Sequence, residues 1–280
     1  MTTTLTAANL AAYAEHLKNE ERSAGTIESY LRHLRAFARW LDGRTPNKDT
    51  ASAWKTHLLA SGYQATTINS KLAALNSFFA FSGCADCRVK PLRLQRRLFR
   101  DEQRQLTRQD YERLVATAQR RGQEQLALVM ETICATGIRV SELAAITLQA
   151  LAKGRADIAL KGKVRTILLP RKLCRKLQTY ARKQHLQHGA LFRAKNGAPL
   201  SRHQIWRAMK TLAHHAGVAA GKVFPHNLRH LFAQVFYANC RDVVRLADML
   251  GHSSVETTRL YLRTSVQEHT RWLETMRLVQ

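Results

Sequence analysis

The sequence predicts a mainly α-helical protein of two domains, with one small β-hairpin in the second domain. Apolar residues recur at three- and four-residue intervals through most of the chain, which is the period of a helix with one buried face. Residues 155–170 instead show two β-prone segments around a short basic turn, as a hairpin does. A basic stretch without an apolar period separates the two helical regions, and 280 residues are enough for two modest domains.

The charge of the chain restricts its partners. Lys and Arg number 45 against 20 Asp and Glu, which gives a formal net charge of +25, so we expect a polyanion, nucleic acid first, as the partner. No apolar run is long enough to cross a bilayer and the N-terminus lacks the order of a secretory signal, so we expect a cytoplasmic protein with no membrane partner. One CxxC, Cys84 and Cys87, has no second pair, which favours reduced thiols over a zinc or redox site.

The first domain is expected at residues 1–86 and contains two clearly amphipathic helices. One lies before Gly43 and the other before Gly83, and each carries an apolar stripe that ends at its glycine. A basic linker follows at residues 87–104, either as a strap along DNA or as an exposed charged linker. The candidate phosphate contacts are a lysine off the second stripe and three linker arginines: Lys71, Arg93, Arg96 and Arg97.

The second domain is expected at residues 105–280. Thr107 is placed to cap the N-terminus of its first helix. Residues 124–136 form a mostly apolar helix that Gly137 ends, and another helix is expected directly after it, over 138–151.

Three basic residues lie at special places in this domain. Arg139 falls at the junction between two buried helices, where it either pairs with an acid such as Glu142 or faces a cleft. Lys161 and Lys163 lie at the tip of the expected hairpin. A lysine there is usually solvated, but a mobile hairpin also suits delivery of an ammonium group to a partner.

The helix expected within residues 224–240 opens with a polar cluster of His226, Arg229 and His230. A zinc site is disfavoured, because the two histidines lack a third ligand and the intervening glutamate of a metalloprotease. Free backbone N–H groups at a helix start attract phosphate, and an arginine can grip two phosphate oxygens. The cluster therefore favours an anion.

A second candidate cluster follows near the C-terminus. A helix ended by Gly251 precedes His252, and Ser253 with Glu256 predicts a capping box for a further helix. Tyr261 is expected about two turns into that helix, with its ring leaning back toward His252. A phosphate fits between the two side chains.

Taken in order, these residues closely resemble the active-site set of the tyrosine recombinases, also called the phage integrase family. The resemblance covers nearly the whole chain. The residues that carry it are Arg139 in ATGIRVSEL, Lys161 at the hairpin, His226 and Arg229 in HNLRH, His252 in LGH, and Tyr261 nine residues later. It implies a helical, SAM-like core-binding domain and a catalytic domain that together form a C-shaped clamp on double-stranded DNA.

The chemistry explains why such residue types belong together. Tyrosine, with a reference pKa of about 10, is a poor nucleophile, and a phosphodiester repels attack, so the site must supply positive charge and proton donors. Arg139 and Arg229 suit the two non-bridging oxygens, where charge builds in the transition state. Tyr261 would then form a 3′-phosphotyrosyl link and release a 5′-hydroxyl. No metal is expected, because the two arginines supply the positive charge. No nucleotide cofactor is expected either, because the covalent link conserves the bond energy.

The resemblance also implies the remaining roles. Lys161 is the acid for the leaving 5′-hydroxyl, while His226 assists proton transfer and His252 hydrogen-bonds the phosphate. The stretch LKGK has a leucine where the family commonly has the first glycine of GKG, so Lys163 competes with Lys161 for the acid role. The expected supporting residues are Glu142, which orients Arg139 or a helix end, and His230.

Assembly and biological role follow from the same resemblance. An amphipathic helix at about 266–280 is expected to pack into a neighbouring protomer and to link four subunits on two DNA recombination sites, although docking on its own domain is the alternative. Integration, excision and dimer resolution all fit a compact, Xer-like recombinase, with or without an accessory protein. Two other classes stay open, a type IB topoisomerase and a DNA-binding protein without catalysis.

Overall fold

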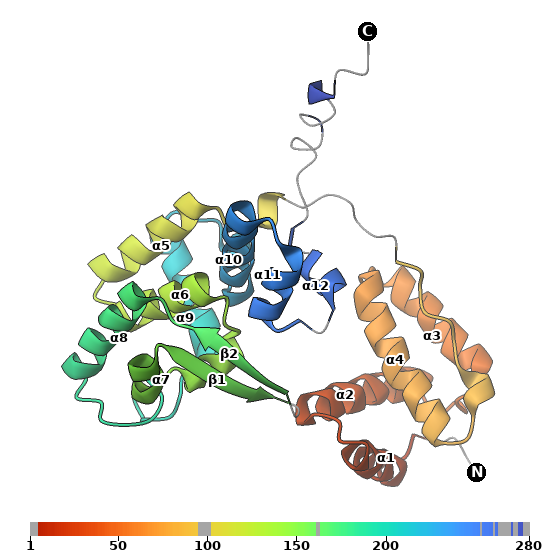
Figure 1. Cartoon of the computed structure of the whole chain (residues 1–280). Helices are drawn as coiled ribbons and strands as arrows, with labels where there is room; N and C mark the ends of the chain where they lie inside the picture. The colour runs from red at the N-terminus through yellow and green to blue at the C-terminus, as the bar shows by residue number, and fades with distance from the viewer. Residues whose placement is uncertain are drawn as a thin grey trace. The chain divides into compact units, whose positions relative to one another are not determined.

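The computed structural model describes residues 5–94, 102–160, 163–252, 254–259, 261–262, 270 and 274–276. It divides into two compact units, Met1–Arg96 and Arg97–Gln280. The described part of the chain is mainly helical, and it contains one sheet, of two antiparallel strands (Figure 1). The fold class predicted from the sequence is confirmed. Within these residues, no helix combines the length and the apolarity that a membrane span requires.

Unit 1 is a four-helix unit. Its helices are α1 (Ala7–Asn19), α2 (Ala24–Leu41), α3 (Lys48–Ala60) and α4 (Ala65–Phe81), followed by the short η1 (Ala85–Cys87). Thr6, Ser23 and Asn47 cap the first three helices through side-chain oxygens. The two predicted amphipathic helices are α2 and α4, and their apolar stripes meet in the core around Phe37, Leu72 and Phe78.

An extended segment after η1 is attached to α4. The side-chain amide of Asn76 donates to the carbonyl of Val89 at 2.9 Å and its oxygen accepts from the Val89 N–H at 3.0 Å. Asn69, two turns earlier, holds Leu92 in the same two-bond manner at 2.9 and 2.8 Å. Because Val89 is also buried, residues 88–92 are part of unit 1, although they fall within the stretch predicted as linker.

Unit 2 contains the hairpin and the remaining helices. Its elements are η2 (Glu102–Arg104), α5 (Arg108–Arg120), α6 (Glu124–Thr136), η3 (Val140–Ala145), α7 (Leu148–Lys153), β1 (Arg155–Leu160), β2 (Lys163–Leu168), α8 (Arg171–Lys183), α9 (Arg202–His215), η4 (Ala220–Lys222), α10 (Pro225–Cys240), α11 (Val243–Leu250) and α12 (Val255–Arg259). Thr107 caps α5 as predicted, in a reciprocal capping box with Asp110.

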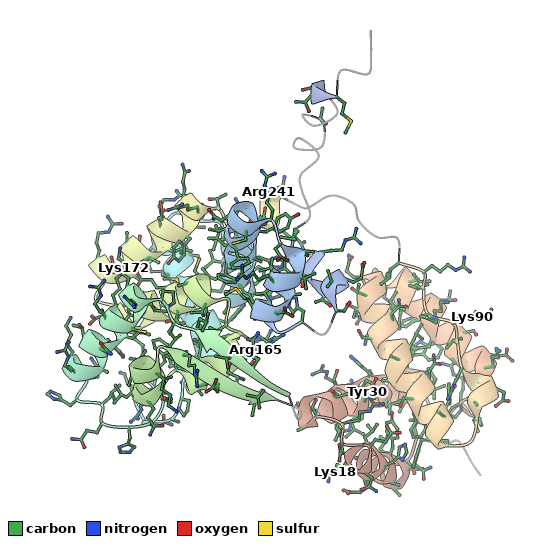
Figure 2. All side chains as sticks on the ribbon, in the orientation of Figure 1. Lys18, Tyr30, Lys90, Arg165, Lys172 and Arg241 are labelled. Carbon is green, nitrogen blue, oxygen red and sulfur yellow. The ribbon has the colours of Figure 1, made fainter. Side chains whose placement is uncertain are left out.

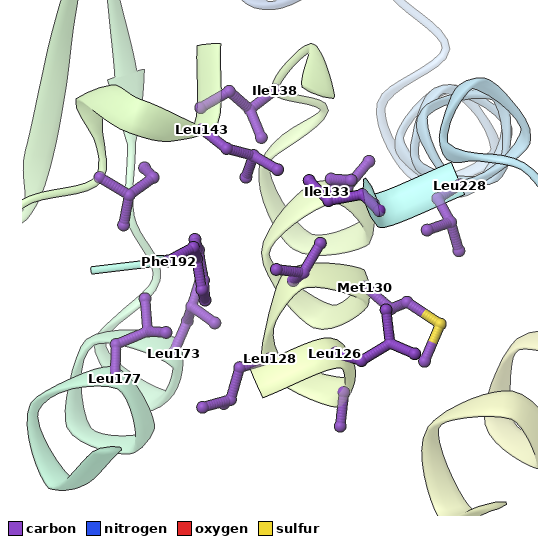
Figure 3. Close-up of a cluster of buried hydrophobic side chains, with 14 of the residues drawn as sticks. Leu126, Leu128, Met130, Ile133, Ile138, Leu143, Leu173, Leu177, Phe192 and Leu228 are labelled. Atoms are coloured by element: carbon purple, nitrogen blue, oxygen red, sulfur yellow. The ribbon is translucent and has the colours of Figure 1, made fainter. Parts of the chain in front are cut away.

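The apolar helix α6 lies at the centre of unit 2. It packs against α5, α8, α9 and α10. Figure 3 shows Met130 and Ile133 of α6 near Leu228 of α10. All three side chains are buried. The start of α10 is thereby fixed against the centre of the core, which leaves little freedom to the polar residues on its first turn.

The predicted helix over 138–151 is wrong in its continuity. The chain forms η3, turns extended at Ile146, and restarts as α7 with Thr147 as N-cap. Ile146 is buried, and its carbonyl accepts a hydrogen bond from the N–H of Leu191 at 2.9 Å. This long-range bond replaces the intrahelical bond that a continuous helix would need.

The predicted hairpin is present. Strands β1 and β2 pair from Arg155 opposite Leu168 to Leu160 opposite Lys163. The two tip residues, Lys161 and Gly162, lie outside the described residues, and for Leu160 and Lys163 the backbone alone is described. Along β2, Arg165 and Ile167 alternate with exposed neighbours, so they share the face that is turned toward the unit.

Gly137 is required where α6 ends. Its φ is +65°, and an added Cβ would lie 2.5 Å from Phe232 of α10. We therefore expect Gly137→Ala to lower the free energy of unfolding by about 1–3 kcal/mol. Urea unfolding of the full chain measures the loss. Gly154→Ala is the matched control, because Gly154 caps α7 at φ +66° with nothing within 4 Å of the added Cβ. An equal loss in the two variants would show that Phe232 contributes nothing.

Candidate active site

Arg139 lies two residues after Gly137, the glycine that ends α6. Its Nη1 donates to Glu142 Oε1 at 2.9 Å, its backbone N–H donates to Glu142 Oε2 at 2.9 Å, and its Nη2 donates to the carbonyl of Gly251 at 3.0 Å. The Arg139 side chain is 34% exposed and lines a hollow, whereas Glu142 is buried. Both alternatives for Arg139 therefore apply, since it pairs with Glu142 and faces a cleft.

Arg229 is the most deeply buried basic residue of the predicted site. Only 2% of the residue is exposed. Its guanidinium donates to the carbonyls of Gly137 and Leu250 and contacts His252 Nε2 at 3.0 Å. Burial and then the charge of Arg139 lower the pKa of Arg229 to about 10, while Tyr261 opposes the change through charge and a side-chain hydrogen bond. The buried positive charge is thus held by helix-end carbonyls rather than by an acid.

His252 is held in one tautomer. A guanidinium can only donate, so the contact with Arg229 makes Nε2 of His252 an acceptor. The proton of the neutral ring is therefore on Nδ1, which donates to Oγ1 of the buried Thr258 at 2.8 Å. Burial, followed by the charges of Arg229 and Arg139, lowers the pKa of His252 to about 4. The pKa of His226 is lowered by burial and by Arg229 as well.

Tyr261 is buried among histidine rings. Its ring centroid lies 4.0 Å from that of His230, 5.1 Å from that of His252 and 5.5 Å from that of His226. The helix predicted to carry Tyr261 is shorter than expected, because α12 ends at Arg259 and the tyrosine lies in the following turn, where its N–H donates to the carbonyl of Thr258 at 2.9 Å. Ser253, the predicted cap, lies outside the described residues.

Arg139, His226, Arg229 and Tyr261 line one hollow of about 540 Å³ on unit 2. His252 contacts Arg229 but is not part of this lining. Among the described residues, the lining contains three arginines, one histidine and one tyrosine, and no carboxylate. The lining residues are Ile138, Arg139, Val140, Ser141, Arg202, Trp206, Phe224, Pro225, His226, Arg229 and Tyr261. The N-terminal part of α10, which bears His226 and Arg229, adds the positive end of a helix dipole. The hollow therefore suits an anionic group such as a phosphodiester.

Sequence reasoning missed Arg165, a further guanidinium beside the site, outside the lining of the hollow. It forms an ion pair with the second oxygen of Glu142 and donates to the carbonyl of Leu250. Burial lowers the pKa of Arg165, and the carboxylate of Glu142 opposes that change. For Glu142, burial raises the pKa, but hydrogen bonds from Arg139 and the charge of Arg165 outweigh it, so the pKa is lowered. Arg165 lies two residues before Ile167, which is buried, so both side chains lie on the same face of β2. This spacing is the signal that could have found Arg165.

The other predicted residues fall elsewhere. Arg96, Arg97 and Lys161 lie outside the described residues, as do all but Thr270 and 274–276 of the predicted exchange helix at about 266–280. Lys71 and Arg93 belong to unit 1, with Arg93 exposed.

The ring centroids of His226 and His230 are 4.6 Å apart. In the parts of the chain that the structure describes, no group of three or more His, Cys, Asp or Glu residues is arranged to hold a metal.

The depressed pKa of His252 makes stability depend on pH. The unfolded chain takes up a proton near pH 6.5, whereas the folded chain resists it until about pH 4. The contribution of His252 is therefore complete above pH 6.5 and is lost as the pH falls toward 4. We expect His252→Gln to flatten the fall in unfolding free energy over this window, in urea titrations at several pH values. Exposed His214→Gln is the control for the loss of one histidine, and an unchanged slope in His252→Gln would contradict the prediction.

The sequence matches two family profiles. The profile described as the phage integrase family matches residues 104–268, more than half of the chain, and the phage integrase N-terminal SAM-like domain matches residues 10–82. The chain belongs to the phage integrase family. The resemblance predicted from the sequence is thus confirmed, and the chain is a tyrosine recombinase, an enzyme of DNA strand exchange.

Individual relatives agree with this assignment. Tyrosine recombinase XerA of Pyrococcus furiosus is 29% identical, over 94% of this chain and 92% of its own length. Tyrosine recombinase XerD of Rhizobium meliloti is 28% identical, over 92% of this chain and 91% of its own length. Two solved structures share the fold. The Tn1549 transposon integrase in complex with circular intermediate DNA has a TM-score of 0.74 at 19% identity, covering 98% of this chain and 99% of that one. A lambda integrase dimer bound to a COC′ core site has a TM-score of 0.73 at 18% identity, covering 93% of this chain and 95% of that one.

Proposed function

We propose that this integrase-family chain cuts and rejoins double-stranded DNA at specific sites through a 3′-phosphotyrosyl link to Tyr261. The observation that carries the proposal is the convergence of Arg139, Arg229 and Tyr261 on one hollow, to which the described part of the chain contributes no carboxylate. Such a hollow attracts a phosphodiester and offers it a nucleophile. The solved relatives include recombinases bound to DNA, which supports DNA as the partner.

The proposed first step forms a bond between the Tyr261 oxygen and phosphorus and breaks the bond to the 5′-oxygen. Arg139 and Arg229 donate to the non-bridging oxygens, which gain charge in the transition state. Three of the other tyrosines, Tyr13, Tyr111 and Tyr180, have their pKa raised by burial, which disfavours the phenolate form that attacks. The 5′-hydroxyl of a partner strand reverses the step, so the exchange needs no metal or other cofactor.

The leaving oxygen needs a proton, and we assign that role to Lys161. The paired ends of β1 and β2 leave Lys161 and Gly162 as a two-residue tip, from which a long side chain can reach another surface. Lys163 is the competing acid, since it lies two residues later. Single-turnover cleavage by Lys161→Ala and by Lys163→Ala distinguishes the two.

The histidines and Glu142 complete the proposed machinery. A phosphate in the hollow replaces His252 as the acceptor for Arg229, and its negative charge favours a protonated His252 that donates from Nε2. His226 assists proton transfer with Tyr261, and His230 supports the tyrosine ring through its contact at 4.0 Å. Glu142 orients Arg139 through two hydrogen bonds.

Unit 1 is proposed to bind the flanking DNA. The ammonium of Lys71 lies 5.0 Å from the ring centroid of Tyr63, and burial and then the charge of Arg32 lower its pKa. A desolvated lysine beside another cation suits a phosphate contact. In this proposal unit 1 is the core-binding domain, and Arg93, Arg96 and Arg97 of the predicted linker follow the DNA backbone. Residues 105–280 are the catalytic domain.

Four protomers on two DNA sites would complete the reaction, linked by the helix at about 266–280. A type IB topoisomerase, the rival with the same chemistry, would relax supercoiled DNA as a monomer and would not join strands of two duplexes. A binding protein without catalysis would form no covalent adduct. Integration, excision and dimer resolution are all outcomes of the proposed strand exchange, and an accessory protein is compatible with each.

The test is to trap the covalent adduct. Nicked duplexes that carry candidate sites from the DNA flanking the gene lose the 5′-hydroxyl strand after cleavage, so the adduct accumulates. With the metal removed by a chelator, we expect a protein–DNA band on denaturing gels for at least one duplex. Salt-sensitive binding to these duplexes without any adduct would contradict the proposal and favour a DNA-binding protein without catalysis.

A further inference from the structure

Arg165 lies on β2, on the face that is turned toward unit 2. Figure 2 labels it beside the hairpin. Its side chain is 15% exposed, and Ile167, two residues along the same face, is buried. A buried guanidinium on a strand is unfavourable unless its donors are used, so its contacts indicate why it is there.

These contacts join three elements. Arg165 Nη2 forms an ion pair with Oε2 of Glu142 in η3, and its Nη1 donates to the carbonyl of Leu250 and approaches that of Met249 at 3.4 Å, in the last turn of α11. The C-terminal end of a helix carries partial negative charge, which favours the guanidinium. Arg165 thereby ties the hairpin strand both to the partner of Arg139 and to the helix before His252.

Gly251 shows how closely Arg165 fits this turn. A Cβ on Gly251 would lie 2.6 Å from Nη1 of Arg165, so a glycine is needed for the approach. The carbonyl of the same glycine accepts from Nη2 of Arg139 at 3.0 Å. The two arginines therefore meet the same backbone residue, directly before His252, as well as the same carboxylate.

The shared carboxylate has an electrostatic consequence. Glu142 carries one negative charge and contacts two guanidinium groups, one through each oxygen. With Arg165 present, the positive charge of Arg139 is only partly neutralised and stays available to a phosphate. Without Arg165, Glu142 would act on Arg139 alone, and part of the attraction for the transition state would be lost.

We propose that Arg165 is a positioning residue for phosphoryl transfer, which balances Glu142 and holds the turn of Gly251 and His252 so that Arg139 can serve the phosphate. The inference rests on the proposed function. Because Arg165 does not line the hollow, it acts through Glu142 and the backbone of α11 rather than on DNA. It adds a residue of β2 to the proposed machinery.

The experiment compares Arg165→Gln, Arg165→Lys and the double variant Arg165→Gln, Glu142→Gln in the full chain. Three quantities are measured on a nicked duplex that the wild-type chain cleaves: the single-turnover rate of adduct formation, the Kd for the duplex, and the melting temperature. Arg113→Gln is the matched control, since Arg113 pairs at 2.6 Å with the buried Asp110 on α5, outside the hollow.

We expect Arg165→Gln to form the adduct about 10–100-fold more slowly, the loss typical of residues that orient a catalytic group, with little change in Kd. Arg165→Lys should recover part of the rate because it keeps the charge beside Glu142. The double variant should be faster than Arg165→Gln, since it removes the unbalanced carboxylate too. Arg113→Gln should form the adduct at the wild-type rate.

Three outcomes would overturn the inference: wild-type rates in Arg165→Gln, a loss confined to Kd, or a double variant no faster than the single one. If Arg165→Gln does not fold, Arg165→Lys decides, because a single ammonium cannot reach both the carboxylate and the carbonyl of Leu250. It should then be several-fold slower than the wild type at unchanged Kd, and a wild-type rate overturns the inference. Absence of any adduct with the wild-type chain would instead overturn the proposed function and, with it, this inference.

Discussion

Replacing Arg229 with glutamine is expected to slow adduct formation by about 10²–10³-fold, the loss measured when one preorganised transition-state donor is removed. Arg229 is the buried partner of the arginine pair, and its guanidinium contacts His252 and the carbonyls of Gly137 and Leu250 at once. A glutamine amide can satisfy one of these acceptors but brings no positive charge to the phosphate. Single-turnover cleavage on a nicked duplex measures the effect.

The same substitution should also destabilise the fold. A buried carbonyl left without a donor costs about 1–3 kcal/mol, so the melting temperature must be measured beside the rate. Arg229→Lys keeps the charge, and we expect it to be faster than Arg229→Gln yet far below the wild type. Arg108→Gln removes an exposed arginine paired with Glu112 and is the control. Folded Arg229→Gln with a wild-type rate would contradict the assigned role.

Tyr261→Phe is expected to abolish the covalent adduct while leaving DNA binding and folding nearly unchanged. The phenyl ring keeps the contacts with His230, His252 and His226, because these contacts involve the ring and not the hydroxyl. The nucleophilic oxygen is lost, together with its side-chain hydrogen bond to Arg229. Denaturing gels measure the adduct, and native gels at several salt concentrations measure binding.

Tyr237→Phe is the matched control for this variant. Tyr237 is half-buried and packs against the same apolar cluster of α10, α11 and Tyr261, so its substitution also removes one hydroxyl from this region. We expect Tyr237→Phe to form the adduct at the wild-type level. Adduct formation by Tyr261→Phe would assign the nucleophile to another residue.

Local sequence signals predicted the helices that position the site. Gly137 and Gly251 end α6 and α11 in the left-handed conformation, and Thr107 caps α5. Each of these signals acts within a few residues, so it can be read without the fold. The pairing of Arg139 with Glu142 is similarly local, at a spacing of three residues.

The missed features depend on contacts between distant residues. The break at Ile146 is fixed by Leu191, and Arg165 is held by Glu142 and by the end of α11, which lies 85 residues further along the chain at Leu250. Asn69 and Asn76 bind the segment after η1 through backbone groups, for which no side-chain pattern exists. Such contacts become visible only when the elements are packed together.

Locating the covalent bond tests the central claim most directly. The trapped adduct is digested with a protease and a nuclease, and mass spectrometry identifies the residue that carries the nucleotide, while end-labelled strands show which DNA end is attached. We predict a 3′-phosphotyrosyl link on the peptide that contains Tyr261, with a free 5′-hydroxyl on the released strand. A nucleotide on any other residue, or a link through a 5′-phosphate, would contradict the account.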